Sequence, residues 1–266
     1  MTKNARLLAD NLTTGYEKRT IISNINVKIP ENQISVILGA NGCGKSTLLK
    51  TFARLIQPYD GQILLDGKLI SSIPSKQVAQ IMGFLPQSPI VPEGIKVTDL
   101  VTRGRFPYRK PLKGMTVEDF KAVEEAMDIM GVTELADRSV DELSGGQRQR
   151  VWIALALAQQ TDILFLDEPT TYLDIAYQVE ILDLLTDLNR KRKTTIVMVL
   201  HDINLSARYA NYIFAMKDGK LVKEGSPSEI ITSELMKQVY GLDCMVMEDP
   251  ISKTPFIVPK GRHHSK

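Results

Sequence analysis

A glycine-rich stretch, GANGCGKST at residues 39–47, limits what this chain can fold into more than any other feature of the sequence. Its pattern of Gly, four residues, Gly, Lys and Ser or Thr is typical of a loop whose backbone N–H groups surround phosphates at the start of a helix. The β-rich run 34–38 precedes this stretch, and an apolar-periodic run, 46–56, follows it. We therefore predict a strand, a phosphate-binding loop and a helix in that order.

The residue types in this loop indicate what it binds. Its glycines permit backbone angles that other residues avoid, so that successive amides can converge on phosphates. These glycines are Gly39, Gly42 and Gly44. Lys45 can neutralise the β- and γ-phosphates, a binding and a catalytic role, and the Ser46 hydroxyl can bind Mg²⁺. Asn41 and Thr47 complete the expected nucleotide contacts. The alternative for the loop is a glycine-rich turn that only caps a helix. Cys43, within the loop, is either a redox switch or a tolerated small residue.

Two adjacent acids follow the apolar run 163–166 directly. The carboxyl ends of buried parallel strands are where ligands collect in an α/β sheet. We therefore expect Asp167 to hold the hydration shell of a metal ion, and Glu168 to orient and deprotonate an attacking water. The same pair could instead cap a following helix.

Two further polar residues follow strand-like runs, and we assign both a catalytic role. His201 comes directly after the apolar run 195–200, and we expect it beside Glu168, within reach of a γ-phosphate. Gln87 comes shortly after the run 83–85, where its amide could sense Mg²⁺, as a metal contact, or the attacking water. A lone histidine at a strand end is otherwise often a core or capping residue, and a glutamine there carries little information by itself.

Composition fits one large α/β domain and argues against a nucleic-acid-binding protein, a disulfide-stabilised protein and a membrane-spanning protein. The 266 residues are 43% hydrophobic, and 33 basic against 31 acidic residues give no reason to expect nucleic acid as a partner. The two cysteines, Cys43 and Cys244, provide no disulfide framework, so we expect a cytoplasmic protein. The most apolar long stretch, 151–158, is far shorter than the roughly 20 residues that cross a bilayer, so any membrane role must depend on a partner.

Periodicity gives the remaining elements. The apolar runs 163–166 and 195–200 enclose an amphipathic helix at 176–192, which is typical of buried parallel strands covered by helices. A helical insertion contains the periodic stretch 117–130. The run 63–65, followed by Asp66 and Gly67, predicts a hairpin. The tail 244–266 has two short β-like runs around Asp249 and Pro250, and we expect little structure at its end, including the solvated His263 and His264.

Residues 143–150 read LSGGQRQR, and by this string the chain is identified as a member of the ABC (ATP-binding cassette) ATPase family. The order of the other motifs is similar to that of the family. They are the loop at 39–47, Gln87, ILFLDEPT at 163–170, the D-loop Thr171 to Asp174 and the switch histidine His201. The resemblance covers about residues 5 to 235. It implies an α/β fold of the P-loop NTPase class, with a mainly parallel sheet, an N-terminal antiparallel β part and a helical subdomain.

The resemblance also implies a division of one ABC ATPase domain at 1–266. Its nucleotide-binding core would comprise 1–87 and 161–243, its helical subdomain with the signature string 88–160, and its C-terminal tail 244–266. The implied cofactors are ATP and Mg²⁺.

The family works as a head-to-tail dimer, so a second copy of this chain is an implied partner. Signature residues of one copy would then contact the γ-phosphate that the other copy holds. They are Ser144, Gly145, Gly146 and Gln147. The predicted helix from 144 to 160 supports this role, because its first amides and its dipole form an anion site. Tyr16 occupies the family position whose ring stacks on adenine. Tyr172 departs from the small residue that many relatives carry before Leu-Asp in the D-loop.

Three stretches resemble importer ATPases for iron-siderophore, haem and vitamin B12 uptake, and the ferric hydroxamate subgroup resembles the chain best. They are GRFPY at 104–108, TYLDIAYQVEILDLL at 171–185 and HDINLSARYA at 201–210. The alternatives are a vitamin B12 or haem importer, an exporter ATPase and an ABC ATPase that acts on ribosomes or DNA.

The importer resemblance implies a peripheral subunit on the cytoplasmic face of the membrane that couples ATP hydrolysis to integral permease subunits. An extracytoplasmic substrate-binding protein would be an indirect partner. The segment from Gln87 through Tyr108 would form a groove for a short permease helix. Basic residues nearby would be available for the carbonyl end of that helix. They are Arg103, Arg105, Arg109 and Lys110.

Overall fold

The computed structural model describes residues 6–17, 19–89, 92–110 and 113–261. The chain forms two compact units, one of Met1–Ser72 with Thr195–Lys266 and the other of Ile73–Thr194. The terminal histidines His263 and His264 lie outside the described residues. The division into core, helical subdomain and tail stays a prediction.

The first unit begins with an antiparallel sheet, as the family resemblance implies. Its strands are β1 (Leu7–Tyr16), β2 (Arg19–Ile29), β4 (Asp60–Leu65) and β5 (Lys68–Leu69), in the order β2-β1-β4-β5, and a 3₁₀ turn, η1 (Ile70–Ser72), follows them. The predicted hairpin is confirmed, because Asp66 and Gly67 join β4 to β5 with positive φ angles of 51° and 75°. Strand β1 was not predicted, because Asp10 and Asn11 interrupt its apolar residues. Pairing with strands on both sides stabilises it.

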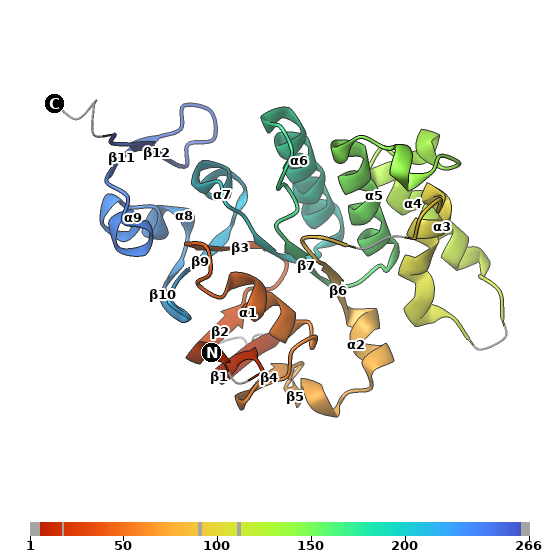
Figure 1. The fold of residues 1–266 in the computed structure, drawn as a ribbon, viewed down its shortest axis with the longest axis horizontal. Helices are drawn as coiled ribbons and strands as arrows, with labels where there is room; N and C mark the ends of the chain where they lie inside the picture. The colour runs from red at the N-terminus through yellow and green to blue at the C-terminus, as the bar shows by residue number, and fades with distance from the viewer. Residues whose placement is uncertain (1–5, 18, 90–91, 111–112, 262–266) are drawn as a thin grey trace. The chain divides into compact units, whose positions relative to one another are not determined.

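The same unit contains the parallel strands that precede the candidate site residues. They are β3 (Ile34–Gly39), β8 (Thr195–Val199) and β9 (Tyr212–Lys217), with β10 (Lys220–Gly225) antiparallel at the edge, in the order β10-β9-β3-β8. Every residue of β8 is buried, which confirms the prediction from its continuous apolar run, and β3, predicted as a strand, is buried along its whole length too. Helix α1 (Lys45–Phe52) packs against β1, β2 and β3 (Figure 1).

Helix α1 is shorter than the apolar run 46–56 predicts. It ends at Phe52, and Arg54 takes a left-handed φ of 60°. The Leu55 N–H then donates to the Lys50 carbonyl, which closes the last turn. The chain therefore leaves the helix four residues before Ile56.

Three short helices and a hairpin complete the first unit. They are α7 (Ile203–Tyr209), α8 (Pro227–Ile230), α9 (Ser233–Tyr240), β11 (Cys244–Glu248) and β12 (Pro255–Pro259). The two β-like runs predicted in the tail are thus confirmed as one hairpin, whose buried Cys244 and Ile257 face inward. The Asn204 side chain on α7 accepts a hydrogen bond from the Ile257 N–H at 2.8 Å, and Arg208 pairs with Asp249 at 2.8 Å. The hairpin is therefore fastened to α7.

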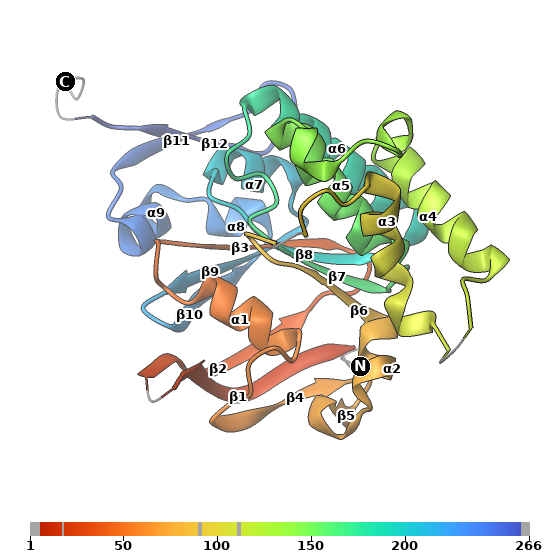
Figure 2. The same ribbon diagram turned by 45° about the vertical axis from the view of Figure 1, so that its right-hand side comes forward.

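The second unit pairs two parallel strands and surrounds them with helices. The strands are β6 (Met82–Leu85) and β7 (Ile163–Asp167). The helices are α2 (Ser75–Ile81), α3 (Val97–Thr102), η2 (Arg103–Tyr108), α4 (Val117–Ile129), η3 (Thr133–Leu135), η4 (Val140–Glu142), α5 (Gly145–Ala158) and α6 (Ile175–Arg192). Helices α3, α4 and α5 pack against one another (Figure 2). The helices predicted at 117–130 and 176–192 are confirmed. In the described part of the chain, no helix is long and apolar enough to cross a bilayer.

Candidate functional site

The loop between β3 and α1 has a backbone that requires glycine. A Cβ atom at Gly39 would lie 2.4 Å from the Met216 carbonyl oxygen, and Gly44 has a φ of 105°. Gly44 is the N-cap of α1, where it makes no side-chain cap, and the first turn of the helix has no acidic residue. The positive end of α1 is therefore directed at whatever the loop binds, as a phosphate-binding loop requires.

Lys45 is buried in this loop, and two backbone carbonyls position its ammonium group. Its Nζ donates to the carbonyl oxygen of Gly39 at 2.9 Å and to that of Ala40 at 3.2 Å. An ammonium group has three N–H donors, so these two bonds orient the third.

Cys43 lies in the same loop. Burial raises the pKa of its thiol, although the Lys45 charge opposes the shift. A thiol with a raised pKa is a poor nucleophile, which favours the interpretation of Cys43 as a tolerated small residue.

In the second unit, parallel pairing of β6 and β7 brings two predicted residues together. Leu85 is opposite Leu166, so the chain leaves both strands at the same end. The Gln87 Nε2 donates to the Glu168 Oε2 at 2.5 Å, across 81 residues of sequence. Asp167, the last residue of β7, is only 1% exposed. Three of the residues expected around a metal ion and a water, Gln87, Asp167 and Glu168, are therefore neighbours at this end of the strands.

Glu168 has an unusual backbone conformation, with a φ of 56°. This left-handed angle costs free energy in a residue other than glycine, and such residues cluster at functional sites. The Thr171 hydroxyl donates to the Glu168 Oε2 at 3.0 Å, and the Thr171 N–H donates to the Glu168 carbonyl at 3.3 Å. The turn that follows β7 thus holds the carboxylate, and the Thr171 contact was not predicted.

His201 and Tyr16 both belong to the first unit. His201 follows the end of β8 and is exposed, and Asp202 after it caps α7 by accepting from the Leu205 N–H. Tyr16 ends β1 with 46% of its surface exposed. An exposed ring can stack on a base, but adenine stacking stays a prediction, as does the expected position of His201 beside Glu168.

The signature string forms the start of α5, as predicted. Ser144 is the N-cap: its Oγ accepts from the Gln147 N–H at 3.3 Å, and the Gln147 Oε1 accepts from the Ser144 N–H at 3.1 Å. The first amides of a helix have no acceptor within it, so those of Gly145 and Gly146 can bind an anion at the positive end of the dipole. Ser144 and Gly145 are exposed, and Gly146 is buried.

An apolar groove of about 610 Å³ lies between α2 and η2. Its lining consists of Ser75, Lys76, Ala79, Phe106, Pro107, Arg109 and Lys110. Phe106 is 75% exposed, and the Lys76 Nζ donates to the Arg109 carbonyl at 2.8 Å, which fixes the distance between the two walls. The groove overlaps the end of the segment predicted to receive a permease helix.

The prediction that Arg105 is available to the carbonyl end of a permease helix is wrong. Its side chain is buried rather than available to a partner, because its Nε donates to the Asp119 Oδ1 at 2.8 Å and its Nη1 to the Ala158 carbonyl at 2.8 Å. The guanidinium also lies over the Tyr108 ring, 3.9 Å from the centroid. Arg105 thus fastens η2 to α4 and to the end of α5. Arg103, Arg109 and Lys110 are exposed, as a docking role requires.

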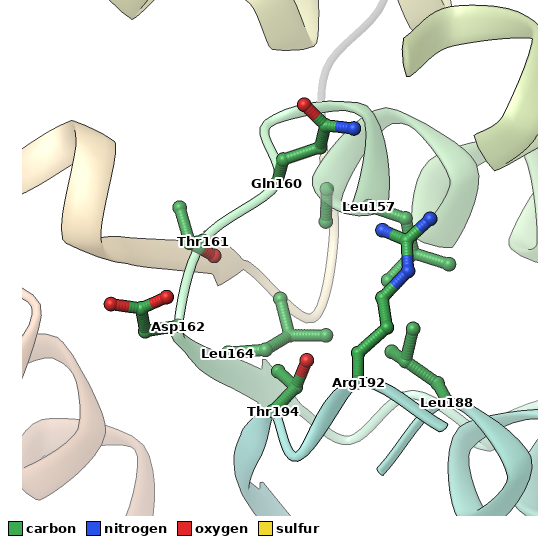
Figure 3. Close-up of a pocket in the computed structure, with 9 residues that line it drawn as sticks. Leu157, Gln160, Thr161, Asp162, Leu164, Leu188, Arg192 and Thr194 are labelled. Carbon is green, nitrogen blue, oxygen red and sulfur yellow. The ribbon is translucent and has the colours of Figure 1, made fainter. Parts of the chain in front are cut away.

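A second hollow, of about 230 Å³, lies at the amino end of β7 (Figure 3). Asp162 and Arg192 lie on opposite sides of it in Figure 3, and Arg192 forms an ion pair with Glu125 of α4. Asp167 and Glu168 are at the other end of the strand. The hollow is therefore separate from the catalytic residues.

A phosphate-binding loop after a buried strand, together with adjacent acids after a buried parallel strand, defines a P-loop nucleotide-hydrolysing protein. The sequence pattern of the family described as ABC transporter matches residues 22–171. This chain belongs to the ABC transporter family, and it is an ATPase that binds and hydrolyses ATP.

Three curated relatives are similar along nearly the whole chain. The probable siderophore transport system ATP-binding protein YusV of Bacillus subtilis (strain 168) is 51% identical, over 95% of this chain and 92% of the relative. The ferric enterobactin transport ATP-binding protein FepC of Escherichia coli (strain K12) is 50% identical, over 97% and 95%. The iron(3+)-hydroxamate import ATP-binding protein FhuC of Bacillus subtilis (strain 168) is 45% identical, over 94% and 93%.

Two solved structures have the same fold. A putative metal-chelate type ABC transporter in an inward-facing conformation matches with a TM-score of 0.84 and 30% identity, over 98% of this chain and 99% of that chain. A dimeric bacterial ABC transporter cassette matches with a TM-score of 0.72 and 29% identity, over 83% and 98%. The predicted fold class is confirmed.

Proposed function

We propose that this chain is the ATP-hydrolysing subunit of an importer that takes up iron-siderophore complexes through a membrane permease. The observation that carries the proposal is the identity of 50% to 51%, over at least 95% of the chain, with two ATP-binding proteins named for siderophore transport. In this function the chain works as a head-to-tail dimer, bound to the permease at the cytoplasmic face of the membrane. The substrate-binding protein outside the cell contacts only the permease.

Each residue of the site has its own role in the proposed hydrolysis of ATP. The Lys45 ammonium and the amides that follow Gly39 bind the β- and γ-phosphates, and Tyr16 stacks on the adenine. The Glu168 carboxylate accepts the proton of the attacking water, while Gln87 and Thr171 hold the carboxylate in place. His201 contacts the γ-phosphate. Ser144, Gly145 and Gly146 of the second copy donate to the same phosphate across the dimer.

The residues expected to hold Mg²⁺ fit that ion. The Ser46 hydroxyl, the Asp167 carboxylate and the Gln87 amide offer oxygen ligands, which Mg²⁺ prefers, and the Asp167 carboxylate is already removed from bulk water. When bound, the ion neutralises the charge that develops on the phosphates. The chain's own contribution is to orient these oxygens at the start of α1 and at the carboxyl ends of β6 and β7.

The groove between α2 and η2 supports the permease part of the proposal. An exposed aromatic ring in an apolar groove is typical of a protein contact, and the groove carries Lys76, Arg109 and Lys110 at its rim. These cations complement the negative carbonyl end of a helix.

Iron uptake from defined siderophores tests which cargo is transported. The relatives at 50% and 45% identity are named for enterobactin and for iron-hydroxamates, so both siderophore types are supplied to a strain from which the gene has been deleted. We expect loss of radiolabelled iron uptake from at least one of them, and rescue by the wild-type gene but not by Glu168→Gln. Haem and vitamin B12 are the controls. Normal uptake of both siderophores with loss of haem or vitamin B12 uptake would contradict the proposed cargo.

A further inference from the structure

The hairpin turn between β9 and β10 has nearly the same backbone as another Asp-Gly turn in the chain. Asp218 and Gly219 have φ angles of 47° and 72°, and Asp66 and Gly67, between β4 and β5, have angles of 51° and 75°. Both pairs are two-residue turns of the kind that these left-handed angles favour. Their surroundings differ. A Cβ atom at Gly67 would have no atom of the described residues within 4 Å, whereas one at Gly219 would lie 2.0 Å from the Ile21 carbonyl oxygen of β2.

The turn at Gly219 is held between β2 and the phosphate-binding loop. Its carbonyl accepts from the Ser23 N–H at 3.2 Å, and its own N–H donates to the Cys43 carbonyl at 3.0 Å. Strand register brings the turn to this position, because β9 runs parallel to β3 with Met216 opposite Gly39, and each strand then continues into the turn or the loop. Both backbone polar groups of Gly219 therefore make contacts outside their own hairpin.

The bond to Cys43 fixes the direction of the peptide group that joins it to Gly44. Among the residues that the structure describes, every peptide bond is trans. In a trans peptide the C=O and the N–H of one plane point in opposite directions. Because the Cys43 carbonyl points to Gly219, the Gly44 N–H points away from the turn. Gly44 is the N-cap of α1, so this N–H lies at the positive end of the helix, where an anion binds.

We propose that Gly219 is a positioning residue for nucleotide binding: its N–H holds the Cys43–Gly44 peptide in the orientation that presents the Gly44 N–H to the phosphates of ATP. This inference rests on the phosphate-binding role that the proposed function gives to the loop. Gly219 itself touches no nucleotide. The Gly44 N–H binds ATP equally before and during hydrolysis, so loss of its orientation should raise KM and leave kcat unchanged.

Gly219→Ala tests the contact, and Gly67→Ala is its matched control. Both substitutions place a Cβ atom on a left-handed residue, so the backbone strain is similar. Only at 219 must the turn also move away from β2 and from the loop. We expect Gly219→Ala to raise the KM for ATP about tenfold, the size of one hydrogen bond to a charged phosphate, at unchanged kcat. Gly67→Ala should change neither constant. Steady-state phosphate release by the full chain measures both.

A folding defect would give a different kinetic result. A smaller folded fraction lowers the apparent kcat and leaves KM unchanged, because the molecules that remain folded bind ATP normally. If Gly219→Ala does not fold, Gly219→Asn keeps a Cβ atom on a residue that tolerates left-handed angles, and it should still raise KM.

The wild-type chain provides a second measurement. In protein labelled with ¹⁵N-glycine, the Gly44 amide resonance should shift when Mg²⁺ and a non-hydrolysable ATP analogue are added. AMP lacks the β- and γ-phosphates and should leave this resonance in place.

Three results would overturn the inference. They are equal KM values for Gly219→Ala and Gly67→Ala, a lower kcat at unchanged KM in Gly219→Ala, and a Gly44 amide that the triphosphate does not shift. Failure of the proposed phosphate loop would look different, because Lys45→Ala would then bind the ATP analogue as tightly as the wild type.

Discussion

At the scale of single residues, the chemistry of the site depends on how neighbouring groups hold Glu168. Two donors meet its Oε2, from Gln87 and from Thr171, and its backbone adopts a left-handed angle that the turn after β7 imposes. The carboxylate is therefore fixed in place before any nucleotide binds. Fixed geometry of this kind is what general-base catalysis requires.

Glu168→Gln should reduce ATP turnover by about 10² to 10⁴-fold, the usual contribution of a general base. The amide cannot take the proton of the water, whereas its oxygen can still accept from Thr171, so nucleotide binding should persist. Phosphate release and ATP-analogue titration measure the two effects. Glu124→Gln, an exposed acid on α4, is the control. Turnover at the wild-type rate would show that another group activates the water.

At the scale of elements, one buried ion pair holds the η2 segment. The side chains of Arg105 and Asp119 are each only 5% exposed. Burial alone would raise the pKa of Asp119, but hydrogen bonds from the Thr116 backbone and from Arg105 outweigh it and lower the pKa. The segment that carries the exposed Phe106 is thereby anchored to α4 and α5.

Arg105→Ala should lower the free energy of unfolding by about 3 to 5 kcal/mol, because it leaves the Asp119 charge buried and unpaired. Arg103→Ala removes an exposed guanidinium two residues away and should change the stability by less than about 0.5 kcal/mol. Urea unfolding of both variants measures the difference. Similar midpoints for the two would mean that the buried pair does not anchor the segment.

The hairpin β11–β12 should show a pH dependence that originates in Asp249. Hydrogen bonds from the Ile251 and Ser252 backbone, with help from Arg208, lower its pKa from 3.8 to about 2. A lowered folded-state pKa stabilises the hairpin above pH 3.8, and the stabilisation is lost as the pH falls toward 2. Asp249→Asn should therefore speed amide exchange in residues 244–259 at neutral pH, and its difference from the wild type should shrink on acidification below about pH 4. A difference that does not change with pH would contradict the assignment.

At the scale of the whole molecule, the proposed function combines ATP hydrolysis with docking to a permease. We expect Phe106→Asp to retain the ATPase activity of the isolated chain, because no residue that lines the groove has a role in phosphate binding or hydrolysis. The same variant should fail to copurify with the permease, since a carboxylate in an apolar groove is costly to desolvate. Lys113→Asp, a change at an exposed residue outside the groove lining, is the control. Normal copurification of Phe106→Asp would place the docking surface elsewhere.

The sequence by itself determined the features that depend on local backbone and on composition. Gly39 and Gly44 give the loop its shape, apolar runs define β3, β7 and β8, and Ser144 caps α5 within a window of four residues.

Only the tertiary structure decided which side chains meet. The contact of Gln87 with Glu168 depends on the register of β6 and β7, and burial turned Arg105 from a predicted docking residue into an anchor. The Gly219 N–H likewise meets the carbonyl of Cys43, a residue of a separate loop. Such pairs leave no periodic signal, because the packing of distant segments, rather than the propensity of either one, brings them together.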